Sequence, residues 1–170
     1  MVLFKALVKS LWIESISTLI VGGRGISWGA FDWIDIFQPY TALENVRVFG
    51  DTAVTFCDAL GMPVEKVEHD HYEDDQGEEN GLTKKNIFLD GLKLVELRTV
   101  DFSSDNDDDE DGLGGFHEGL KMWLTVRKGA AGMLPAFAIR DCSISPDQVE
   151  ELKEMTEIDW DLVENLQDTE

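Results

Sequence analysis

The apolar residues of this chain recur in short frames with a hydrophobic residue at every second position. The frame spanning 134–144 places Leu134, Phe137, Ile139 and Ile144 at its apolar positions. Residues 137 and 139 face the same way in a strand, because strand side chains alternate between two faces. Leu134 and Ile144 then fill the bends on either side. The frame therefore predicts one short strand whose two bends share its hydrophobic interior.

Similar frames recur along the chain. They start at residues 16, 43, 92, 134 and 155, so successive starts are 27, 49, 42 and 21 residues apart. Two of these steps lie in or near the range of about 20–29 residues that is usual for a short repeat. The two long steps contain acidic insertions with glycine, which a repeat array accepts as loops. We expect strands at about 17–21, 44–49, 93–98, after Pro135, and 157–161.

Helical spacing of apolar residues fills the stretches between the frames. In the segment from Trp28, we expect Phe31, Ile34 and Phe37 to share one face, with Trp33 beside them. Asp51 or Thr52 is a candidate cap for the next helix. The expected helices are 2–12, Trp28 to Phe37, Asp51 or Thr52 to Leu60, Phe116 to Lys128, and one that begins with the capping sequence Ser145-Pro146-Asp147-Gln148. Residues 64–72 alternate partially and are a candidate for an additional, irregular strand.

The repeated frame matches the pattern of a leucine-rich repeat, L-x-x-L-x-L-x-x-N/C-x-L, with Cys142 at the Asn/Cys position of the frame at 134–144. The fold class expected is therefore α/β: an irregular leucine-rich-repeat solenoid with a curved parallel sheet and helices on its convex side. We expect one such domain over 1–170, with acidic loops at about 73–81 and 103–112 and a polar tail at 162–170.

Two segments resemble one family in particular. "LPAFAIRDCSISPDQVEELKEMTEIDWD" is similar to the last repeat and closing strand of fungal F-box proteins with irregular leucine-rich repeats, and "STLIVGGRGISWGAFDWIDIFQPYTALENVRVFG" resembles their earlier repeats. The resemblance implies a non-catalytic module that recruits protein targets for ubiquitination. In that family an N-terminal F-box binds a Skp1-type adaptor. No F-box is recognisable in this chain, so we expect that partner only if an F-box lies upstream, and the target protein is not identified.

The frames also predict which side chains point away from the interior. The ladders expected on the outer, concave face are Ile20, Arg47, Glu96, Ala138 and Asp159; Gly22, Phe49, Arg98, Arg140 and Asp161; and Thr18, Asn45, Leu94, Ala136 and Glu157. The candidate partner-binding residues are Arg47, Phe49, Glu96, Arg98 and Arg140. The three arginines have two open interpretations. They neutralise neighbouring acids, Arg47 with Glu96 and Arg140 with Asp161, or they anchor an acidic or phosphorylated partner segment.

The formal net charge of −21 argues against two classes of binding partner. A chain this acidic repels phosphate backbones and anionic membrane surfaces, so neither nucleic acid nor membrane is expected as a partner. The apolar start of the chain is broken by Lys5 and Lys9 and is too short to span a bilayer. The two cysteines, Cys57 and Cys142, lie in apolar surroundings and predict reduced thiols in an intracellular compartment, cytoplasm or nucleus.

The acidic insertion at 103–112 suggests an alternative function. Asp107, Asp109, Asp111 and Glu118 fit the spacing of an EF-hand calcium loop. Against calcium binding, the loop follows a strand instead of an entering helix, and its eighth position is Gly114. The alternative is thus an acidic calcium-binding protein that uses the 107–118 loop.

Other candidate chemistry is weaker. His69 and His71 would share one side of a strand, but further metal ligands cannot be specified. The Gly22–Gly25 segment lacks the endings of known phosphate-binding loops. Since no nucleophile–base pair and no cofactor fingerprint can be assembled, we expect no enzyme, no catalytic residues, no metal and no cofactor.

Overall fold

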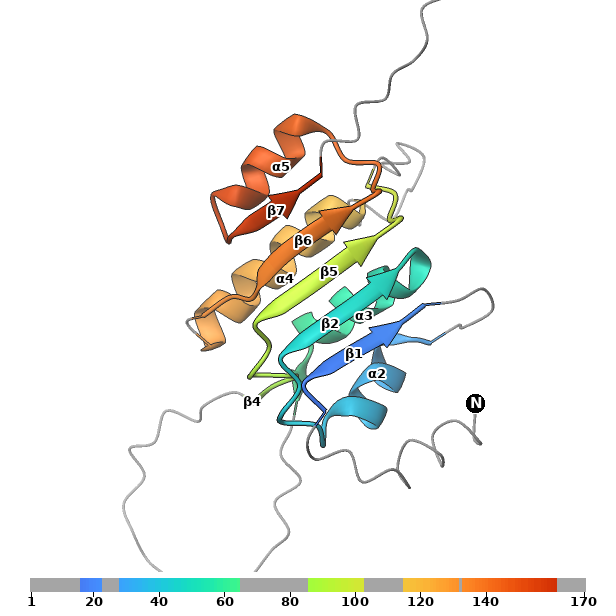
Figure 1. Ribbon diagram of the computed structural model, residues 1–170. Coiled ribbons are helices and arrows are strands. Elements are labelled where there is room, and N and C mark those ends of the chain that lie inside the picture. Colours follow the sequence, from blue (N-terminus) through green and yellow to red (C-terminus); the bar gives the residue numbers. More distant parts are fainter. Residues whose placement is uncertain (1–15, 23–27, 65–85, 103–114, 132, 162–170) are drawn as a thin grey trace, which may run out of the picture.

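The computed structural model describes residues 16–22, 28–64, 86–102, 115–131 and 133–161, and its centre is a parallel sheet of five strands (Figure 1). The strands, in spatial order, are β1 (Thr18–Val21), β2 (Asn45–Phe49), β5 (Leu94–Arg98), β6 (Ala136–Arg140) and β7 (Ile158–Trp160). Spatial order follows chain order, and every neighbouring pair is parallel. The predicted α/β class with a single parallel sheet is confirmed.

The strand register is the one that the repeated frames predict. Leu19 pairs with Val46, Val46 with Val95, Val95 with Phe137, and Phe137 with Ile158. Because side chains in a strand alternate between two faces, this alignment directs one row of apolar side chains to the same side of all five strands.

The helices lie between consecutive strands along the chain. They are α2 (Ala30–Phe37), α3 (Asp51–Gly61), α4 (Phe116–Ala131) and α5 (Pro146–Lys153). In Figure 1, α2, α3 and α4 lie behind the sheet, all on one face. Leu152 of α5 belongs to the same buried cluster as the inward side chains of these three helices. No helix in the described part of the chain is long and apolar enough to cross a bilayer.

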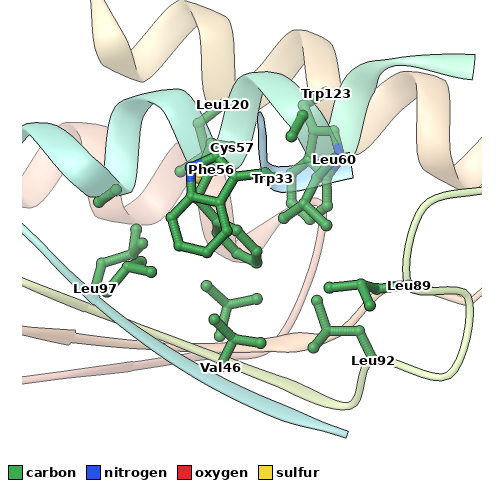
Figure 2. Close-up of a cluster of buried hydrophobic side chains, with 14 of the residues drawn as sticks. Trp33, Val46, Phe56, Cys57, Leu60, Leu89, Leu92, Leu97, Leu120 and Trp123 are labelled. Carbon is green, nitrogen blue, oxygen red and sulfur yellow. The ribbon is translucent and has the colours of Figure 1, made fainter. Parts of the chain in front are cut away.

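Aromatic and aliphatic side chains fill the space between the sheet and the helices. Figure 2 shows Trp33 of α2 and Phe56 and Leu60 of α3 above Val46 and Leu97 of the strands. Trp33 is fully buried, and its ring centroid lies 5.0 Å from that of Phe56. Its indole Nε1 donates to Thr55 Oγ1 at 3.1 Å, so its polar atom is satisfied inside the core.

The inward face of α2 differs from the prediction. Trp33, Ile36 and Phe37 are buried, whereas Phe31 is 76% exposed. Positions 33, 36 and 37 follow the i, i+3, i+4 spacing of one helix face, and position 31 lies on the opposite side. The prediction is therefore wrong for Phe31, whereas Phe37 is buried and Ile34 packs against the core as expected. The contact of Trp33 with Phe56 lies on this buried face.

The start of α3 also differs from the prediction. The cap is Gly50, not Asp51 or Thr52, and its φ of 52° lies in the region that favours glycine. The Gly50 amide donates to the Arg98 carbonyl at 2.9 Å. Glycine thus turns the chain from β2 directly into α3 with no intervening loop.

The capping sequence of α5 behaves as predicted. The Ser145 hydroxyl accepts from the Gln148 amide, and the Gln148 side chain accepts from the Ser145 amide, at 3.2 and 3.0 Å. Pro146 is the first helical residue. This reciprocal pair satisfies two amides that a helix start otherwise leaves unpaired.

The described residues between α3 and β5 add no strand to the main sheet. β3 (Pro63–Val64) pairs antiparallel with β4 (Asn86–Ile87) in a separate two-stranded sheet. β2 pairs directly with β5, so the irregular strand suggested for 64–72 does not lie between them. The remainder of that segment is outside the described residues.

Arg127 of α4 is almost completely buried. Its terminal nitrogens donate to the carbonyls of Phe88 and Leu89, and its guanidinium carbon lies 5.8 Å from the Trp123 ring centroid. Burial lowers the pKa of Arg127 to about 10, so the group stays protonated at neutral pH. The side chain therefore holds the segment that leads into β5 against the helix layer.

Replacing Leu97 by alanine tests this core. Leu97 is fully buried between the sheet and the helices, so Leu97→Ala is expected to lower the free energy of unfolding by about 2–5 kcal/mol. The control is Val126→Ala on the exposed side of α4, expected to change it by less than about 0.5 kcal/mol. Urea denaturation followed by circular dichroism measures both. Equal losses from the two variants would contradict the described core.

Candidate functional site

The face of the sheet opposite the helices, called the open face here, carries the candidate residues. No described helix lies on it (Figure 1). Its side chains come from alternate positions of adjacent strands: Thr18, Ile20, Asn45, Arg47, Phe49, Leu94, Glu96, Arg98, Ala136, Ala138, Arg140 and Asp159. All five predicted partner-binding residues, Arg47, Phe49, Glu96, Arg98 and Arg140, lie together on β2, β5 and β6.

At the centre of the open face, Glu96 is held by two arginines. Its Oε2 accepts from Arg47 Nε at 2.6 Å, and its Oε1 accepts from Arg98 Nε at 2.5 Å. Only 12% of the Glu96 side chain is exposed, against 40% and 35% for the two arginines. We call these three residues the Arg–Glu–Arg clasp. The predicted pairing of Arg47 with Glu96 is confirmed, and Arg98 joins it.

The clasp fixes Glu96 in its ionised form. Partial burial alone would raise the pKa of Glu96, but hydrogen bonds from Arg98 and Arg47 and their positive charges outweigh it and lower that pKa. Charge-assisted hydrogen bonds of this kind are stronger than neutral ones. Both arginines therefore have their inner Nε atoms anchored and their side chains oriented.

Arg140 pairs with a different acid from the one expected. Its Nη2 donates to Asp159 Oδ2, and its Nη1 donates to the Asp159 carbonyl at 2.9 Å. Asp161 instead accepts from the backbone amide of Asp141 at 3.3 Å. The Asp161 amide still donates to the Ile139 carbonyl of β6 at 3.3 Å, but its carboxylate is turned to the Asp141 amide, and Asp159, which pairs with Ala138, is left for Arg140.

Three carboxylates gather where β6 and β7 end. They belong to Asp141, Asp159 and Asp161, and we call them the acidic edge. Asp141 has a φ of 53°, an uncommon conformation that aspartate tolerates better than most residues. Its Oδ2 lies 3.8 Å from Arg98 Nη1. The acidic edge thus borders the clasp, with Arg140 paired to it.

Phe49 contributes an aromatic ring to the open face beside Gly22. A Cβ atom placed on Gly22 would lie 2.5 Å from Cδ2 of Phe49. The ring therefore occupies the space that any other residue at position 22 would need. Phe49 and exposed Ile20 give the β1–β2 side of the open face an apolar character.

A second polar cluster, missed by sequence reasoning, joins α4 to α5. Nearly buried His117 lies beside Glu118 and Glu151, and single ligand atoms of the three lie within 4.8 Å of one another. Lys121 Nζ already sits between the two carboxylates, 3.1 Å from Glu118 and 2.7 Å from Glu151. Hydrogen bonds from Lys121 lower the pKa of Glu151. The lysine supplies the cation here, and the cluster fastens α5 to α4.

Several sequence candidates fall outside the described residues. His69, His71, Asp107, Asp109 and Asp111 belong to this group. Glu118, the last position of the calcium-type spacing, lies in the first turn of α4 and pairs with Lys121. Calcium binding by the 107–118 loop therefore stays a prediction.

The cysteines are both unpaired thiols, as predicted. Burial raises the pKa of Cys57 far above its usual range, and burial also raises that of Cys142. Cys142 Sγ accepts from the Val100 amide at 3.4 Å. This is a packing role in the bend after β6, and neither thiol is activated as a nucleophile.

Comparison with protein-family models, with curated proteins and with solved structures finds no significant match for this chain. The function is therefore inferred from the geometry of the open face.

Removing the charge of Glu96 is expected to change the pH dependence of stability. Because folding lowers its pKa from an ordinary value near 4.5, the clasp stabilises the folded state above that pH, and this contribution is lost as the pH falls through the folded pKa. Glu96→Gln should lower the free energy of unfolding by about 1–3 kcal/mol at pH 7. The difference from the parent protein should shrink below about pH 4.5.

The control is Glu44→Gln, which breaks an exposed pair with Lys93 at 2.6 Å. That pair is worth at most about 1 kcal/mol because solvent screens it. Denaturant melts at several pH values compare the two variants. A Glu96→Gln loss that is the same at pH 3 and pH 7 would show that the ionised clasp does not stabilise the fold.

Proposed function

We propose that this chain is a non-catalytic protein-interaction module, the target-recognition part of an F-box-type ubiquitin ligase adaptor. The observation that carries the proposal is a parallel sheet with helices on one face and none of the described helices on the other. Parallel sheets are ordinarily covered on both faces, since each crossover helix must pack somewhere. A bare face is characteristic of leucine-rich-repeat arrays, in which all crossovers lie on one side.

The strand order supports an irregular leucine-rich-repeat solenoid. Strands β1, β2, β5, β6 and β7 are neighbours in chain order, as stacked repeats would be. Each of the five apolar frames supplies one of these strands. Repeat arrays present their open side as an extended binding surface, so the open face is where we propose that a target binds.

The composition of the open face suits protein recognition. It presents arginine side chains and the aromatic ring of Phe49, and both residue types are enriched at protein interfaces. Ile20 is 59% exposed at one side of it. A Skp1-type adaptor would bind through an F-box upstream of these repeats and not through this face.

Site-specific photo-crosslinking in cells that express the protein tests the proposal. A benzophenone residue is placed in the full native chain at position 20, on the open face, or at position 31, on the exposed side of α2. Both native side chains are exposed, so neither substitution should cost much stability. We expect a discrete protein adduct from position 20 that is absent from position 31. Co-purification of a Skp1-type adaptor is expected only if an F-box lies upstream of these repeats. Equal adducts from both positions, or none from position 20, would contradict target binding at the open face.

The alternative function has a separate test. Calorimetric titration of the whole chain with calcium is expected to show only weak heat that added salt removes, since an acid-rich segment attracts cations without a built site. Saturable binding in the micromolar range, lost in Glu118→Gln, would instead favour the calcium-binding protein.

A further inference from the structure

The terminal nitrogens of the clasp arginines point to the chemistry of the partner. Arg47 and Arg98 each use Nε to hold Glu96, and their terminal Nη atoms form no hydrogen bond with another described residue. Arg98 Nη1 lies 3.8 Å from Asp141 Oδ2, within ion-pair range but beyond hydrogen-bond distance. The terminal N–H groups of a guanidinium held in this way can still donate to a carboxylate. They match its two oxygens in a forked, two-bond arrangement.

Positive charge is concentrated at the Arg47 side of the clasp. Two arginines face one glutamate, and Asp141 offsets part of the charge of Arg98 from 3.8 Å, on a chain whose formal net charge is −21. Because Glu96 already fixes both guanidinium groups, an incoming anion need not order them, and little side-chain entropy is lost on binding.

At the acidic edge, negative charges outnumber positive ones. Asp141, Asp159 and Asp161 lie around Arg140, which pairs with Asp159. A basic side chain from a partner would therefore be attracted to this edge, while an acidic one would be repelled. The open face thus carries a positive centre over β2 and β5 and a negative border at β6 and β7.

We infer that the open face binds an extended protein segment that places an aspartate or glutamate on Arg47 and Arg98 and a lysine or arginine on the acidic edge. This inference rests on the proposed function. The two centres are about two strand spacings apart, or about 10 Å, which an extended segment covers in about three residues. A carboxylate fits better than a phosphate, because a doubly charged group would lie beside the acidic edge of an already acidic protein.

Selection of short displayed peptides on the immobilised chain tests this inference. We expect enriched peptides to carry Asp or Glu followed, about two to four residues later, by Lys or Arg. Their affinity should fall by about tenfold or more in R47E/R98E. R47Q/R98Q serves as a second variant in case charge reversal beside Glu96 disturbs folding. Peptides with the acid replaced by lysine should recover binding to R47E/R98E.

The matched control is K128E/K153E. It makes the same change in net charge with two lysines from α4 and α5, and it should alter affinity by less than about twofold. A further variant, Leu94→Trp, blocks the open face sterically without changing its charge. Leu94 is partly exposed, precedes Glu96 by two residues on the same face of β5, and lies between Asn45 and Ala136 in the register.

The outcomes separate the two proposals. Enriched peptides that lose binding in Leu94→Trp but lack the acid–base pair overturn this inference and leave target binding at the open face intact. The same holds for peptides that respond equally to both charge-reversal variants. A phosphoserine peptide that binds more than about tenfold tighter than its glutamate counterpart overturns the carboxylate assignment. No enrichment, or peptides unaffected by Leu94→Trp, counts against both the inference and the proposed function.

Discussion

The structure depends on one-sided burial of a parallel sheet held in register. Leu19, Val46, Val95, Phe137 and Ile158 align across five strands and face the helices. A shift of any strand by one residue would turn its apolar row toward the open face, so burial of the row specifies the register. Trp33, Phe56 and Trp123 then close the interior from the helix side.

The same alignment assembles the candidate site. Arg47 and Glu96 are 49 residues apart in sequence, and the pairing of β2 with β5 brings them into a hydrogen bond. Arg98 lies two residues beyond Glu96, so it lies on the same face. The clasp is therefore a by-product of the register that buries the core, and the hydrogen bonds at Nε hold both guanidinium groups beside Glu96.

Much of this could be predicted from the sequence, because period-two frames determine both strand positions and outward ladders. The pairing of Arg47 with Glu96 followed from that register. The partner of Arg140 did not, since it depended on the Asp161 carboxylate accepting from the backbone amide of Asp141. The exposure of Phe31 depended on how α2 packs against α3. The His117, Lys121 and Glu151 cluster depended on the contact of α4 with α5, for which the chain carries no short-range pattern.

The most direct test is a double-mutant cycle between Arg47 and Glu96, with free energies of unfolding measured for R47Q, E96Q and the combined variant. Residues in contact in one hydrogen-bond network should show a coupling of about 0.5 kcal/mol or more. Arg47 and Asp159, separated by β5 and β6, provide the reference pair and should show additive effects. The predicted result is a coupling free energy for Arg47 and Glu96 and none for Arg47 and Asp159. If the changes in the free energy of unfolding are additive for both pairs, the result would contradict the register on which the open face depends.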